Sequence, residues 1–183
     1  LHQLGLGVHM YAMDNDDKMP PIYRSASIFT TYWMRHNSVY CNLGLLLIGN
    51  YITPPRTFYC LSGGARPNET LAYNGPDNNW TNTSVRSSYP ARTEVKIING
   101  ANVITSDWKL RNYVTNVIYS DFVGVTGWQG GGIETGFIYM AHDGKGYNRL
   151  FGDGSTRWAR VGPLTCKVST TTPTLLQQWS FYL

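Results

Sequence analysis

The stretch Asn148-Arg-Leu-Phe-Gly-Asp-Gly-Ser-Thr-Arg-Trp158 is the strongest local pattern in this 183-residue chain, and it decides the fold class. Asp153-Gly154 lies between two short runs that contain large apolar residues, and this pair supplies the positive φ values that a tight two-residue turn demands. The stretch therefore predicts a β-hairpin with Asp153-Gly154 at its tip. Phe151 and Trp158 are predicted to point into or against the core, where their apolar area anchors both strands.

Similar runs recur upstream of this hairpin. Short segments rich in β-branched and aromatic residues alternate with turn residues through the second half of the chain. The predicted strands span residues 94–98, 102–106, 116–125, 136–141, 148–151 and 155–160. An antiparallel meander is the simplest arrangement of such runs, so we expect a mostly antiparallel sheet.

The opening of the chain predicts a helix over residues 1 to about 14. Its apolar positions recur at helical spacing and are Leu1, Leu4, Val8 and Tyr11 or Ala12. The polar run at 14–17 and Pro20-Pro21 then end the helix, because proline lacks an amide donor and disfavours helix in the residue before it. The apolar stripe needs a surface to pack on, which we expect to be the sheet. A helix followed by antiparallel strands predicts an α+β fold.

Composition indicates one exported globular domain. Charged residues make up 14% of the chain and aromatic residues another 14%, a balance typical of exported β-rich proteins with polar loops. The net charge of +4 comes from scattered Arg and Lys without a basic arm, so nucleic acid is not an expected partner. Residues 43–48 predict a short helix, and residues 62–88 have the composition of long irregular connections.

Two segments carry a family resemblance. The opening Leu1-His-Gln-Leu-Gly-Leu-Gly-Val-His-Met-Tyr-Ala-Met-Asp-Asn-Asp16 and the closing His142-Asp-Gly-Lys-Gly-Tyr-Asn-Arg-Leu-Phe-Gly-Asp-Gly-Ser155 resemble type IV pilin-like proteins and type II secretion pseudopilins. Phe58-Tyr59-Cys60 is similar to a Phe-Tyr-Cys-Pro-Ser sequence of that family, with Leu61 in the usual place of proline. The spacer between His142 and Asp153 is one residue longer than the commonest form.

The resemblance implies a pilin-like head domain over residues 1–183. Its expected parts are the C-terminal part of the pilin helix at 1–16, a loop-rich insertion region at 17–92, an antiparallel sheet at 93–160 and a C-terminal extension at 161–183. In the family, a cleaved and methylated prepilin leader precedes a hydrophobic membrane helix, which we expect to have been removed here.

The implied function is a non-enzymatic subunit of a pseudopilus or pilus-like fibre. Its partners would be other pilin or pseudopilin subunits and, through the missing helix, the bacterial inner membrane, before assembly in the periplasm or at the cell surface. The alternative is an extracellular carbohydrate-binding or adhesive module. Its partner or sugar contacts would be exposed tryptophans, with Trp80, Trp108 and Trp128 as candidates.

The residues around His142 have two alternative chemical interpretations. His142, Asp153 and Gly154 are interpreted as a structural signature that holds the terminal turn together, although His142 with Asp143, Asp153 or Asp121 could also form a metal or acid–base cluster. No nucleophile-elbow or HExxH motif is present in the sequence, so we expect no enzyme.

The acidic run and the cysteines leave further alternatives open. Asp14, Asp16 and Asp17 have the oxygen-rich spacing of a calcium loop, and major pseudopilins use calcium in their heads, but the same run also suits a solvated turn that ends a helix. Cys41, Cys60 and Cys166 lack zinc-finger spacing. A Cys41–Cys60 disulfide and two small buried thiols are equally compatible with the sequence.

Overall fold

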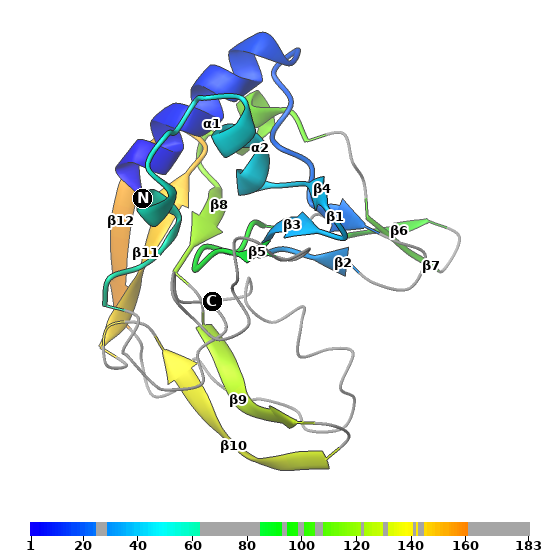
Figure 1. Ribbon diagram of the computed structural model, residues 1–183, viewed down its shortest axis with the longest axis vertical. Coiled ribbons are helices and arrows are strands. Elements are labelled where there is room, and N and C mark those ends of the chain that lie inside the picture. Colours follow the sequence, from blue (N-terminus) through cyan, green and yellow to red (C-terminus); the bar gives the residue numbers. More distant parts are fainter. Residues whose placement is uncertain are drawn as a thin grey trace.

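The structure, a computed structural model shown in Figure 1, consists of one long helix, several short helices and small antiparallel sheets. The residues that it describes are 1–24, 29–62, 85–92, 95–98, 101–104, 108–121, 123–129, 132–140, 142 and 145–160. The mixed α+β class predicted from the sequence agrees with this architecture.

The helices and strands of the described residues follow one another closely. The helices are α1 (His2–Asp14), α2 (Leu43–Ile48), η1 (Pro55–Phe58) and η2 (Leu110–Tyr113), of which the last two are 3-10 helices. The strands are β1 (Tyr23–Arg24), β2 (Phe29–Thr30), β3 (Trp33–His36), β4 (Val39–Tyr40), β5 (Val85–Arg86), β6 (Val95–Ile98), β7 (Ala101–Ile104), β8 (Val117–Ser120), β9 (Val123–Gln129), β10 (Gly132–Met140), β11 (Gly146–Phe151) and β12 (Thr156–Arg160).

The helix α1 packs on the rest of the chain through the stripe that its sequence predicts. Leu4, Val8 and Ala12 are buried, whereas Tyr11 is only partly buried. Figure 1 shows α1 running beside α2, with β11 below its N-terminal end, and α1 contacts α2, η1 and β11. The predicted helix and its packing on β-structure are confirmed, and part of its covering surface comes from α2 and η1.

The acidic run ends α1 as a turn. Asp16 and Asp17 have positive φ values of 54° and 66°, and the Asp17 amide donates to the Ala12 carbonyl at 2.7 Å. Asp residues tolerate this left-handed conformation better than most because their short side chains can bond locally. The chain therefore leaves the helix at Asn15 and reaches Pro20 already extended.

The strands form several small sheets where the sequence predicts one sheet. Every pairing between described strands is antiparallel, in the orders β12-β11-β8, β4-β3-β5, β1-β2, β6-β7 and β9-β10. The strand predicted at 116–125 is wrong because the chain breaks into β8 and β9 around Asp121. Asp121 is buried and takes donors from Asn148, since a buried carboxylate needs such partners. The strand β8 therefore pairs with β11, whereas β9 pairs with β10.

The region 17–92 is more structured than the predicted loop-rich insertion. Its described parts contain β1 to β5, α2 and η1. They contribute fully or almost fully buried side chains to the main core, namely Met34, Leu43, Leu46, Phe58 and Val85. The helix predicted at 43–48 is confirmed as α2. Its Gly44 lies so close to β3 that an added Cβ would sit 1.8 Å from the Met34 carbonyl oxygen.

One polar contact crosses the core between the two halves of the chain. The hydroxyl of Tyr119 in β8 donates to Asn42 Oδ1 at 2.7 Å, and the Asn42 amide donates to the Thr31 carbonyl. Tyr119 and Asn42 are fully buried. Burial raises the pKa of Tyr119 because the phenolate would lose its hydration.

The closing hairpin has a longer turn than the sequence predicts. Gly154 has a φ of 81° and its amide donates to the Phe151 carbonyl, while the Phe151 amide donates to the Ser155 carbonyl. The loop is therefore Gly152-Asp153-Gly154, a three-residue turn with a glycine bulge. Phe151 is buried as predicted, but Trp158 is 44% exposed because β12 presents its side chains mostly outward.

Candidate functional site

Three side chains from distant parts of the sequence converge at one place. Cys60 follows η1, Asp121 follows β8, and His142 precedes β11. One ligand atom from each residue lies within 4.8 Å of the other two. In the described part of the chain, no other group of three or more His, Cys, Asp or Glu side chains meets this criterion. We refer to Cys60, Asp121 and His142 as the thiol–imidazole cluster.

Asp121 forms the floor of the thiol–imidazole cluster. Its side chain is 1% exposed, and its Oδ2 accepts from the backbone amide of Asn148 at 2.6 Å and from the Asn148 side chain at 2.9 Å. The same oxygen lies 2.8 Å from His142 Nε2. Its other oxygen, Oδ1, is buried without a hydrogen-bond partner in the described residues. One carboxylate oxygen is thus crowded with donors, while the other has unused lone pairs.

His142 forms the rim of the cluster. Its φ of 57° is unusual for a residue with a side chain, and its backbone is held by bonds to the Ser62 carbonyl and the Lys145 amide. The edge of the imidazole meets Trp158 at a centroid distance of 4.9 Å. Gly146 makes room for this contact, because an added Cβ would lie 2.5 Å from the Trp158 ring. The hairpin therefore places the imidazole.

The neighbours of His142 Nε2 make opposite demands on its protonation. Asp121 Oδ2 lies 2.8 Å away, Asn148 Nδ2 lies 3.0 Å away and Cys60 Sγ lies 3.6 Å away. A proton on Nε2 satisfies the carboxylate but opposes the amide donor of Asn148. A bare Nε2 accepts from Asn148 but turns its lone pair toward a carboxylate oxygen.

The cluster does not have the geometry of a thiol hydrolase. A thiol–imidazole–carboxylate relay requires the thiol at one ring nitrogen and the carboxylate at the other. Here Cys60 and Asp121 both face Nε2 of His142. The three groups instead direct ligand atoms toward one point.

The structure separates the predicted signature residues. His142 is held by the thiol–imidazole cluster, whereas Asp153 Oδ1 accepts from the Ser155 amide at 2.8 Å within the hairpin loop. Hydrogen bonding from the Ser155 side chain, together with that from its backbone amide, lowers the pKa of Asp153, because it favours the carboxylate. No described contact joins His142 to Asp153, and their joint role in holding the turn stays a prediction. Gly154 has the turn role that was predicted for it.

The acidic turn brings its carboxylates to different partners. Asp14 Oδ2 accepts from the Tyr51 hydroxyl at 2.8 Å, and Asp17 lies 3.3 Å from the Arg111 guanidinium. Asp14 and Asp16 line a pocket of about 300 Å³ at the end of α1. The three carboxylates Asp14, Asp16 and Asp17 are not gathered into a ligand set, so calcium binding here stays a prediction.

The candidate tryptophans do not form a described platform. Trp108 is 7% exposed and stacks on Tyr113 at 5.6 Å, so its predicted role as a surface contact is wrong. Burial against the helix η2 is the physical reason. Trp80 lies outside the described residues, and of Trp128 only the backbone in β9 is described. Trp158 is the exposed tryptophan of the described side chains, and it contacts His142.

The cysteines have separate environments. Cys41 and Cys60 form no disulfide. Cys41 is buried, and its thiol donates to the Trp33 carbonyl at 3.3 Å. Burial raises the pKa of Cys41 to about 12 because the thiolate would be poorly solvated. Cys166 lies outside the described residues.

Sequence reasoning missed Cys60 and Asn148 as members of this site. The sequence did place His142 and Asp121 together as one alternative. The signal for Cys60 was its position in the Phe58-Tyr59-Cys60 segment of the family resemblance, which carried no assigned role. Asn148 was interpreted only as the start of a strand, and its contact with Asp121 depends on the pairing of β11 with β8.

Comparisons with models of protein families, with curated proteins and with solved structures found no match for this chain.

Proposed function

We propose that the chain is the head domain of a non-enzymatic subunit of a type II secretion-like pseudopilus or type IV pilus-like fibre, which assembles through α1. The resemblance of the opening and closing segments supports this class. In the described residues, none of the helices has the length and hydrophobicity that a bilayer crossing requires.

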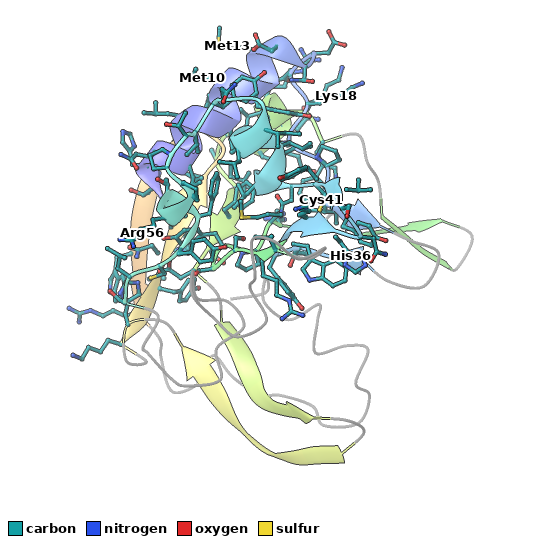
Figure 2. The ribbon with its side chains drawn as sticks, viewed as in Figure 1. Met10, Met13, Lys18, His36, Cys41 and Arg56 are labelled. Atoms are coloured by element: carbon teal, nitrogen blue, oxygen red, sulfur yellow. The ribbon has the colours of Figure 1, made fainter. Side chains whose placement is uncertain are left out.

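The observation that carries the proposal is an apolar stripe on the outer face of α1. Leu6, Met10 and Met13 are 56%, 50% and 84% exposed. Their spacing of four and three residues places them on one side of the helix. Figure 2 shows Met10 and Met13 on the side of α1 that faces away from the rest of the chain. We call these three residues the outer stripe.

The outer stripe is unusual for a helix that lies on a protein surface. A surface helix buries one apolar face and turns charged or polar residues to water. Here the inner face is buried, and no Asp, Glu, Lys or Arg occurs before Asp14. Helices of neighbouring subunits in a fibre would cover such a face. Full burial of each side chain is worth roughly 1.5 to 3 kcal/mol.

The carbohydrate-binding alternative lacks a comparable observation. It requires several exposed tryptophans on one face, because sugars stack on aromatic rings. Trp33 and Trp108 are buried, and Trp158 is the exposed one of the described tryptophan side chains. The described surface therefore favours assembly over sugar binding.

Substitution of the outer stripe tests the proposal. In the bacterium that makes the protein, full-length Met10→Glu is expected to be lost from sheared surface fibres, because a charge would be buried between helices. Val39→Glu in β4 is a matched control, since Val39 is 59% exposed and lies away from α1. The free energies of unfolding of the purified variants should lie within about 0.5 kcal/mol of the parent value, because both positions face solvent.

The outcome can also contradict the proposal. Normal recovery of Met10→Glu in the fibre fraction, or its equal loss in the Val39→Glu strain, would remove α1 as the assembly surface. Absence of the parent protein from any surface fibre would remove the fibre function itself.

A further inference from the structure

We propose that the thiol–imidazole cluster is a binding site for a divalent transition metal, with Zn²⁺ as the expected ion. The ligands would be the Cys60 thiolate, His142 Nε2 and one carboxylate oxygen of Asp121. This inference is independent of the proposed fibre function, because that function rests on the outer stripe of α1 and the cluster contains none of its residues.

The spacing of the ligand atoms suits a tetrahedral ion. Zn–S bonds of about 2.3 Å and Zn–N bonds of about 2.05 Å at tetrahedral angles place sulfur and nitrogen about 3.6 Å apart. Cys60 Sγ and His142 Nε2 are 3.6 Å apart. The nitrogen and oxygen ligands would lie about 3.3 Å apart. Nε2 and Asp121 Oδ2 are 2.8 Å apart, so a shift of about half an ångström would admit the ion.

A cation resolves the conflict around the imidazole. A metal ion takes the lone pair of Nε2, so this nitrogen carries no proton directed at the Asn148 amide, which donates to Asp121 Oδ2. The ion also stands between Nε2 and the Asp121 carboxylate, where two acceptors would otherwise face each other. The buried Oδ1 of Asp121 has no described partner, so the carboxylate keeps lone pairs for a ligand bond.

The supports of the site come from outside the ligand set. Asn148 fixes Asp121 through its backbone and side chain, and Trp158 fixes the ring plane of His142. Partners of this kind commonly orient metal ligands. His142 retains 21% of its side-chain exposure, which gives an ion access and leaves the fourth position to water.

The ligand types select the metal. A thiolate with one imidazole and one carboxylate suits Zn²⁺, whereas Ca²⁺ and Mg²⁺ require oxygen ligands throughout. The cluster joins the segment after η1, the end of β8 and the segment before β11. A bound ion would therefore hold three distant parts of the chain together.

Cobalt binding tests the site. The 183-residue chain carrying Cys166→Ala, prepared with chelator and then titrated with Co²⁺, is expected to bind one ion and to develop a thiolate-to-cobalt charge-transfer band. Cys60→Ser should remove the band, and Asp121→Asn and His142→Gln should weaken binding by at least about tenfold. Cys41→Ala is the matched control with a thiol outside the cluster, and it should leave the band and the affinity unchanged. Displacement by Zn²⁺ should erase the band.

Several outcomes would overturn the proposal. They are the absence of a charge-transfer band in the folded parent, a band that persists in Cys60→Ser, and a band that is lost in Cys41→Ala. Circular dichroism of each variant confirms that it is folded. Because Cys60→Ser keeps the size of the side chain, its loss of the band at unchanged dichroism supports the site and does not reflect misfolding.

Discussion

The thiol–imidazole cluster and the acidic turn each contain three potential metal ligands but arrange them in opposite ways. In the turn, Asp14, Asp16 and Asp17 are adjacent in sequence, yet Tyr51 and Arg111 draw two of them apart. In the cluster, the ligands are separated in sequence by 61 and 21 positions and nevertheless converge within 4.8 Å. Adjacent carboxylates repel one another and prefer separate partners, whereas convergence on one point requires the packed fold.

The largest expected effect concerns the two thiols. Burial raises the pKa of Cys41 from its ordinary value of 9.0 to about 12, which lowers its thiolate fraction near pH 8 by about 1000-fold. We expect alkylation of Cys41 to be slower by at least this factor in the folded chain than in the unfolded chain. Stability contributed by the neutral thiol is present below pH 9 and is lost as the pH rises toward 12.

Site-resolved mass spectrometry measures this reactivity. Zn²⁺ should slow alkylation of Cys60 without changing Cys41, if the cluster binds the ion as proposed. Equal protection of both thiols by Zn²⁺ would indicate a general change in the fold and would remove the contrast between the cluster and the core.

Asp121→Ala should give the largest loss of stability. The change removes a buried carboxylate and leaves the partly buried Asn148 donors without their acceptor, at a cost of about 4 kcal/mol. Asp16→Asn at the acidic turn is the control, since Asp16 is exposed and asparagine tolerates its positive φ of 54°. Chemical denaturation of both variants measures the difference, and similar values would show that the cluster is no more integrated than the turn.

Gly146→Ala should disturb the thiol–imidazole cluster indirectly, through the contact of Trp158 with His142. The added methyl group would lie 2.2 Å from the Ala159 carbonyl oxygen and 2.5 Å from Trp158, so the indole must move away from His142. Overpacking of this kind costs about 3 kcal/mol. Changed imidazole proton resonances in an NMR spectrum would report the displaced ring. Unchanged resonances would mean that Trp158 does not place His142.

Gly154→Val should act on the hairpin without acting on the cluster. A β-branched residue at a φ of 81° is strained, at a cost of about 2 kcal/mol. Because Asp153 and Gly154 have no described contact with His142, metal affinity should stay within about twofold of the parent in the same titration, a change of less than about 0.5 kcal/mol. A loss of metal affinity equal to that of His142→Gln would show that the hairpin loop at Gly154 and the metal ligand His142 depend on each other.

The smallest effect is expected at the acidic turn. Asp14→Asn removes a charge from an exposed position and should change stability by less than about 0.5 kcal/mol. Thermal melts with and without millimolar calcium measure both the effect of the substitution on stability and any stabilisation by calcium. A clear rise in melting temperature with calcium that disappears in Asp14→Asn would establish the predicted calcium site and reverse the comparison.

Much of the fold could be predicted from local patterns. The helical spacing of Leu4 and Val8 predicted α1 and its buried face, and the Asp153-Gly154 pair predicted the position of the last hairpin. Both signals are local, because helix periodicity and glycine φ depend on neighbouring residues. The short helix at 43–48 was predictable for the same reason.

The sheet arrangement and the cluster could not be predicted in this way. Strands of two to four residues, such as β3 and β5, are too short to show alternation, so residues 17–92 were interpreted as a loop-rich region around the short helix at 43–48. The break at Asp121 depends on Asn148, which lies 27 positions away. Ligands that are brought together by tertiary packing have no characteristic spacing in the sequence by which they could be recognised.

The hydrogen bond between Tyr119 and Asn42 has a consequence for folding cooperativity. Its donor comes from the second half of the chain and its acceptor from the first, and both are sealed in the core. Separation of the halves would leave a phenol and an amide without partners in apolar surroundings, unless both halves melted. The bond therefore favours unfolding of the described parts of residues 17–92 and 93–160 in one transition.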